Sequence, residues 1–301
     1  MFLAPLAGLL LVTGPVTARE WRWLIGTGAA SLFWLVMSGG IADQVANATA
    51  VVMTGAFVAS SIAEGRPVFT RACWAVLIAS VCVALWCAVW GIAWQDLELA
   101  LTRQWWAVSR DLSIVAGPVV NQSTETRQFF ERLADAGRPL AQLFPARLIV
   151  SGILGLVVAA SWHQRITGRS LGPAAERLGD FRFTDHLVWV VILAVAVLLL
   201  PSFHLVQDLA DQSPVGGMLL FTVEYWGPAA QNTLVVCGAL YAARGAAVLS
   251  RFLRPVPAMI LVVIATIFLL PFAFIGLAAV GLADTWANFR RWLDVASTLG
   301  R

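Results

Sequence analysis

Residues 229–251, AAQNTLVVCGALYAARGAAVLSR, form an apolar run of membrane-spanning length that contains one internal arginine, Arg244. A helix needs about 20 apolar residues to cross a bilayer, and a charge near its middle costs at least about 2.5 kcal/mol on insertion scales. Arg244 lies about 10 Å from Arg251 along such a helix, at 1.5 Å per residue. We therefore predict that Arg244 faces the protein interior or a wet cavity. There it either bonds to carbonyl groups of a neighbouring helix or serves a functional pocket, with Tyr241 on the same helical face, or a contact with a partner protein.

The composition of the whole chain is that of a membrane protein. Apolar residues make up 59% of the 301 residues and charged residues only 12%, so lipid must cover most of the apolar surface. We predict a single all-α integral membrane domain over residues 1–301. The net charge of +3 is too small to indicate nucleic acid as a partner. The four cysteines lie in apolar runs without metal-ligand spacing, so we predict no disulfide framework, metal or cofactor.

Eight stretches approach the length of one membrane crossing. They are residues 2–17, 22–39, 45–63, 72–94, 145–163, 186–203, 229–251 and 257–283. Arginines, Arg66 and Arg71 among them, fall in alternate connections, which the positive-inside rule places in the cytoplasm. This predicts a bundle of about eight spans with its N-terminus outside and with the connection from His204 to Pro228 outside. An even number of spans also places the C-terminus outside, although Arg290 and Arg291 indicate the opposite. Either the last stretch, which contains Pro271, is broken and does not cross fully, or the first stretch does not cross, or the tail is an exception to the rule.

Residues 95–144, between the fourth and fifth spans, carry two predicted amphipathic helices. In the first helix the apolar positions Leu97, Leu101, Trp105, Val108 and Leu112 share one face. The second has a possible N-cap at Ser123 or Thr124 and ends near Gly137 and Pro139. We predict that both lie on the extracytoplasmic surface, where they either seal the bundle or form a lid over a ligand. Residues 284–301 are predicted to be an amphipathic C-terminal tail.

Two spans carry small residues at four-residue spacing, which allows helix backbones to approach closely. These residues are Gly55, Ala59 and Ala63 in the third stretch, and Gly238, Ala242 and Ala246 in the seventh. Such faces serve internal packing more often than partner binding. We nevertheless identify Gly55, Ala59 and Ala63 as the candidate docking face for another membrane protein.

Polar side chains gather near the outer end of the 229–251 stretch. The candidate ligand-binding residues are Glu224, Trp226, Gln231 and Asn232, with Asn47 at the start of the third stretch and Tyr241 and Arg244 deeper in the seventh. The alternative is that Gln231 and Asn232 simply cap the start of a helix. On the cytoplasmic side we predict that Thr184 or Asp185 caps the helix that follows, and that Asp284 contacts Arg291 one to two turns later.

A series of motifs in the second half resembles the YybS-like family of predicted bacterial membrane proteins. The motifs are LFPARLIVSGILGLVVAASWHQRI, LGDFRFTDHLVWVVILAVAVLLL, QNTLVVCGALYAARGAAVLSRFL and FIGLAAVGLADTWANFRRW, and the resemblance covers residues 140–292. That family is similar in fold to the S components of energy-coupling-factor transporters, which capture small solutes on the outer side. The resemblance implies an S-component-like protein of the bacterial cytoplasmic (inner) membrane. At Arg244 this chain departs from the family, which usually has a neutral polar residue there.

Two classes of function follow from these expectations. The first is capture or translocation of a small solute, of unknown identity, with a partner energising assembly. The alternative is a non-transporting scaffold or regulatory subunit that assembles with other membrane proteins. The sequence contains no P-loop, GxSxG or HExxH motif, so we predict that the chain is not an enzyme. A polar, outward-facing pocket is the feature that distinguishes a transporter from a scaffold.

Overall fold

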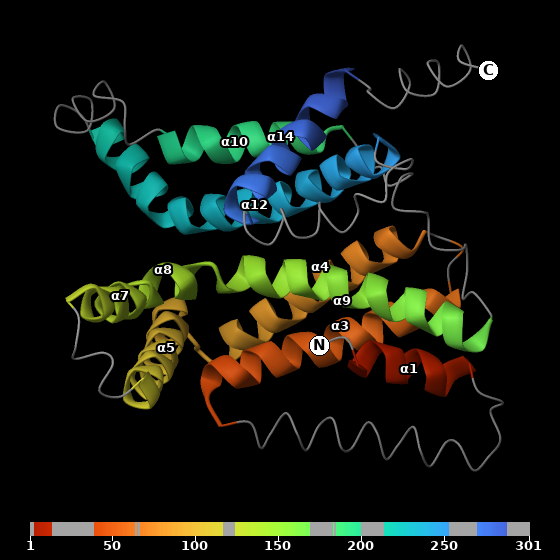
Figure 1. The fold of residues 1–301 in the computed structure, drawn as a ribbon, viewed down its shortest axis with the longest axis horizontal. Coiled ribbons are helices and arrows are strands. Elements are labelled where there is room, and N and C mark those ends of the chain that lie inside the picture. Colours follow the sequence, from red (N-terminus) through yellow and green to blue (C-terminus); the bar gives the residue numbers. More distant parts are fainter. Residues whose placement is uncertain are drawn as a thin grey trace. The chain divides into compact units, whose positions relative to one another are not determined.

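The computed structural model describes residues 3–13, 39–63, 65, 67–116, 124–168, 183, 185–199, 214–252 and 270–287. Within these residues the protein is helical throughout and has no strand, as predicted (Figure 1). The chain divides into two compact units, residues 1–175 and 176–301, and each has its own packing.

In the first unit, α1 (Leu3–Thr13), α3 (Ile41–Ala63), α4 (Val68–Val89) and α9 (Phe144–Thr167) pack together. Their core consists of buried apolar residues from all four helices. These are Leu9 of α1, Met53 and Phe57 of α3, Val68, Ala72, Ala75, Val76 and Ala79 of α4, and Leu156 of α9. Small residues let the helices approach closely, since a Cβ on Gly152 of α9 would lie 2.6 Å from the sulfur of Met53. This core holds α3 and α9 side by side.

The amphipathic helices predicted for residues 95–144 are present at one end of this bundle. They are α5 (Trp94–Ala116), α7 (Thr124–Asp135) and the short α8 (Gly137–Gln142). Leu97 of α5 is buried against Ala42 and Val45 at the start of α3. The α7 helix begins at Thr124 as predicted, but after Asp135 the chain forms α8 instead of leaving the helical conformation near Gly137. Trp105 and Trp106 join α5 to α7, because their indole N–H groups donate to the carbonyls of Leu133 and Ala134 at 2.7 and 3.2 Å.

The second unit consists of α10 (Leu187–Leu199), α12 (Pro214–Phe252) and α14 (Leu270–Ala287). The α12 helix contacts both others, and α10 runs antiparallel to it in Figure 1. By contrast, α14 crosses α12 obliquely in Figure 1 and runs in roughly the same sense, from the contact of Gly238 with Phe274 to that of Arg244 with Asp284.

Two glycines set the separation of α12 and α14. A Cβ on Gly245 would collide with the backbone of Leu277, and a Cβ on Gly281 would collide with the backbone of Tyr241. The predicted small face of α12 therefore serves internal packing: Ala242 is buried, and a Cβ on Gly238 would touch the Phe274 ring at 3.6 Å. Direct backbone contact of this kind is typical of helices that pack within a bilayer.

Four of the helices are long and apolar enough to cross a membrane. They are Ile41–Ile62, Val68–Val89, Phe144–Thr167 and Trp226–Leu249, and they match four of the eight predicted spans. The predicted stretches 2–17 and 186–203 contain the shorter helices α1 and α10. Most of the 22–39 stretch and residues 257–269 lie outside the described residues. These helices indicate a multi-pass membrane protein.

One prediction about the second unit was wrong. Residues 214–228, assigned to a connection, are the first part of the 39-residue helix α12, which continues through Pro228. Proline removes one backbone hydrogen bond and kinks a helix, but helices that span a membrane tolerate it. The sequence left open whether the final stretch 257–283 crosses the membrane fully or is broken near Pro271. In the described part of this stretch, α14 begins at Leu270, next to Pro271.

Candidate functional site

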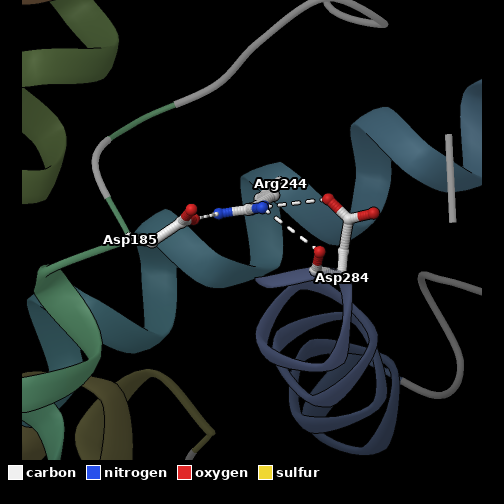
Figure 2. A network of polar contacts seen from close by, with 3 residues as sticks. All are labelled: Asp185, Arg244 and Asp284. Atoms are coloured by element: carbon white, nitrogen blue, oxygen red, sulfur yellow. Dashed lines mark hydrogen bonds and ion pairs between the residues drawn. The ribbon is translucent and has the colours of Figure 1, made fainter. Parts of the chain in front are cut away.

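Arg244 is paired with carboxylates from two neighbouring segments. Its Nε donates to Oδ2 of Asp284 at 3.0 Å, and its Nη2 donates to the backbone carbonyl of the same residue at 3.3 Å. Its Nη1 donates to Oδ1 of Asp185, just before α10, at 2.9 Å (Figure 2). The predicted bond to a carbonyl of a neighbouring helix is therefore present. The two carboxylates supply most of the contact, and the guanidinium joins all three helices of the second unit.

The two ion pairs of Arg244 differ in their exposure. The side chains of Arg244 and Asp284 are only 7% and 2% exposed, whereas that of Asp185 is 66% exposed. The ring of Phe183 lies 5.4 Å from the guanidinium carbon and meets Tyr241 edge to face at 5.1 Å. Arg244 and Asp284 thus form a buried, charge-neutral pair beside aromatic rings, while the carboxylate of Asp185 is largely exposed.

Among the predicted ligand-binding residues, Tyr241 and Arg244 lie together at this cluster. The others lie earlier in α12 or on α3. Asn232 is half-buried and donates through Nδ2 to the carbonyl of Pro228 at 2.8 Å. Gln231 and Trp226 are exposed, and the side chain of Glu224 lies outside the described part of α12. Because α12 begins at Pro214, the alternative that Gln231 and Asn232 cap its start is wrong.

The predictions for the acidic residues of the second unit missed their shared partner. Asp185 was assigned to helix capping and Asp284 to a contact with Arg291, which lies outside the described residues. Both aspartates bind Arg244, from 59 and 40 residues away in the sequence, and neither contact was predicted from the sequence. The available signal was the presence of a few isolated charges in otherwise apolar segments, which must find partners within the protein.

A second buried arginine, Arg71, was assigned to a cytoplasmic connection. It lies in the first turn of α4, which begins at Val68, and it is only 2% exposed. Its guanidinium carbon lies 5.9 Å from the centre of the Phe57 ring of α3. A charge count places such an arginine at a helix end but cannot show that its side chain turns inward.

A cavity of about 540 Å³ lies in the first unit, between the starts of α3 and α9 and the helices α5 and α8. Its wall is apolar over most of its area and includes Leu101, Val108, Leu140, Phe144 and Leu148. Its polar groups come from three helices: Asp43 of α3, Gln104 and Trp105 of α5, and Arg147 and Ser151 of α9. Cavities of 300 to 1,000 Å³ with apolar walls and few polar groups are typical of small-molecule sites.

Hydrogen bonds hold α8 against α5 beside this cavity. Glu98 of α5 accepts from Nε of Arg138 at 3.1 Å and from Nε2 of Gln142 at 3.3 Å. Between the cavity walls, Nε2 of Gln104 donates to Oδ1 of Asp43 at 3.3 Å, which links α5 to α3. Glu98 is mostly buried and Arg138 is exposed, so this ion pair lies at the protein surface where α5 meets α8.

The predicted ligand residue Asn47 and the predicted docking face both belong to α3. Asn47 is half-buried and follows Ala46, a wall residue, but it is not itself part of the wall. Gly55 and Ala59 of the candidate docking face are exposed in this unit, and the side chain of Ala63 lies outside the described residues.

Comparisons with protein-family models, with curated proteins and with solved structures find no match to this chain.

Proposed function

We propose that this chain is a multi-pass membrane protein that binds a small solute in the cavity between α3, α5, α8 and α9. The observation that carries the proposal is the convergence of Asp43, Gln104 and Arg147 on an otherwise apolar space of about 540 Å³. Water-accessible apolar space with a few convergent polar groups is the usual form of a ligand site. A scaffold needs no such space.

The position of the cavity supports capture from one side of the membrane. Its walls include the first turns of α3 and α9, which are both long enough to span the bilayer, so the cavity lies near one membrane surface. By the positive-inside rule that surface is the outer one. The amphipathic helices α5 and α8 then act as a lid, and release on the other side requires a partner that supplies energy.

A second function is favoured by one observation, the exposure of Gly55 and Ala59 on α3. Small residues on an exposed face of a membrane helix permit close docking of another helix. In this alternative the chain is a scaffold or regulatory subunit in the bacterial cytoplasmic membrane, and the cavity is incidental.

Native mass spectrometry of the gently extracted protein distinguishes the two functions. Ala46→Phe places a phenyl ring in the cavity, and Ala59→Phe places the same ring on the exposed face of the same helix. Solute binding predicts a retained small molecule that is lost in Ala46→Phe and kept in Ala59→Phe. A protein that carries no small molecule, and that loses a co-purifying membrane protein in Ala59→Phe alone, is a scaffold.

A further inference from the structure

The cavity presents one negative and one positive side chain from different helices. Asp43 lies in the first turn of α3, and Arg147 lies in the first turn of α9. They are the two formally charged residues of the cavity wall within the described part of the chain. The protein therefore brings opposite charges to one space without a charged group between them.

Neither charge is neutralised by a described residue. The carboxylate of Asp43 accepts a hydrogen bond from the neutral amide of Gln104 and forms no ion pair there. The Arg147 side chain is exposed and has no hydrogen bond or ion pair with the described residues. Close by, Glu98 and Arg138 pair at 3.1 Å, so opposite charges do combine in this unit where their geometry allows it.

We infer that the cavity binds a molecule that carries both an ammonium group and an anionic group. The ammonium donates to Asp43, and the carboxylate or phosphate accepts from the guanidinium of Arg147, whose planar fork matches such anions. The apolar wall formed by Leu101, Leu140, Phe144 and Leu148 accommodates an apolar substituent. This inference rests on the proposed function, because it specifies the ligand of the same cavity.

Two sources supply this chemistry at a membrane surface. One is a free amino acid, in which the carboxylate meets Arg147. The other is the headgroup of phosphatidylethanolamine, in which the phosphate meets Arg147 and the acyl chains remain in the bilayer. A net anion such as phosphatidylglycerol lacks the ammonium group, and phosphatidylcholine lacks its N–H donors, so neither satisfies Asp43.

The test compares ligands that differ by one charge on the purified full-length protein. Leucine is compared with isopentylamine, which lacks the carboxylate, and with 4-methylpentanoate, which lacks the ammonium group. Phosphatidylethanolamine is compared with phosphatidylglycerol and phosphatidylcholine in nanodiscs.

Binding is measured by native mass spectrometry and by the shift in thermal unfolding temperature. We expect the zwitterion of one series to bind at least about tenfold more tightly than its single-charge analogues, since a hydrogen bond to a charged group contributes about 1.5–3 kcal/mol. The series that binds identifies the source.

Variants localise the binding. Asp43→Asn and Arg147→Gln are each expected to weaken the binding about tenfold or more. Asp96→Asn and Arg165→Gln, which change exposed residues of the same unit outside the cavity wall, are expected to leave it unchanged.

Equal binding of the zwitterion and its single-charge analogues to the native protein overturns the inference, and this comparison requires no variant to fold. A retained molecule that is lost in Ala46→Phe but unaffected by Asp43→Asn and Arg147→Gln also overturns it, while the proposed solute site stands. A native protein that binds nothing contradicts both.

Discussion

Arg244 and Asp284 stabilise the second unit only as a pair. Both side chains are buried, and three donor groups of the guanidinium are used by Asp284 and Asp185. Removing one member of a buried ion pair leaves an uncompensated charge, whereas an exposed pair contributes little because water replaces the missing partner. The two aspartates are therefore expected to differ greatly in importance.

We predict that Arg244→Gln and Asp284→Asn each lower the free energy of unfolding by about 3–5 kcal/mol, and that Asp185→Asn lowers it by about 0–1 kcal/mol. Steric trapping in bicelles measures this quantity directly. The double variant Arg244→Met/Asp284→Leu, which removes both buried charges, should be more stable than either single variant. Equal losses for Asp185→Asn and Asp284→Asn would show that burial does not set the contribution of each pair.

The contact between Gly281 and the backbone of Tyr241 leaves no room for a methyl group. We predict that Gly281→Ala separates α12 from α14 and lowers the thermal unfolding temperature in mild detergent. Gly276→Ala is the matched control, because it lies on the same helix and a Cβ there meets nothing within 4 Å. Since alanine favours a helix over glycine by up to about 1 kcal/mol, the control should be neutral or stabilising. An unchanged unfolding temperature for Gly281→Ala would contradict the close contact.

At the scale of the helices, the contacts of Arg244 with Asp185 and Asp284 determine which helix ends lie together. The start of α10, the last third of α12 and the end of α14 meet there. In the sequence, arginines precede α10, end α12 and follow α14. We therefore expect these three helix ends to lie on the same side of the membrane.

We predict that single cysteines at His186 and Ala287 are modified by a membrane-impermeant maleimide from the same side, the cytoplasm, in a background without native cysteines. Leu199→Cys, at the other end of α10, should be modified from the opposite side. The reagent is applied to intact cells and to inverted vesicles. Labelling of positions 186 and 287 from opposite sides would be incompatible with a parallel α12 and α14.

Sequence patterns predicted these helices better than their ends and their partners. The four long spans and the amphipathic α5 depend on local periodicity, which is visible in the sequence. The start of α12 at Pro214 was missed because Pro228 was taken as a boundary, although a kinked helix continues through it. Arg244 contacts Asp284 and Asp185, which are 40 and 59 positions away in the sequence. These contacts and the cavity depend on tertiary packing, which a local sequence pattern does not contain.

Across the described residues, the apolar helices carry large apolar side chains on their surface. Examples are Leu85 and Val89 of α4, Leu154 of α9 and Leu193 of α10, each more than half exposed. Water does not solvate such surfaces favourably, so lipid must cover them. The protein is therefore expected to behave as an integral protein and not as one attached to the membrane surface.

We predict that alkaline carbonate, which releases peripheral proteins, leaves the full chain in the membrane pellet, and that only detergent extracts it. Immunoblotting of the two fractions measures this. A peripheral protein of the same host provides the control for complete release. Recovery of this chain in the carbonate supernatant would show that α3, α4, α9 and α12 do not cross the bilayer.

The pairing of Arg244 with Asp284 also determines how the protein responds to voltage. A single charge moved across the full membrane potential changes energy by about 2.3 kcal/mol per 100 mV. Because the two buried charges lie 3.0 Å apart, the forces that the field exerts on them are opposite and largely cancel, and the exposed carboxylate of Asp185 is the remaining charge of this cluster. An energised membrane therefore leaves this contact undisturbed, whereas a chain with either charge alone would be pulled along the membrane normal whenever the potential rose.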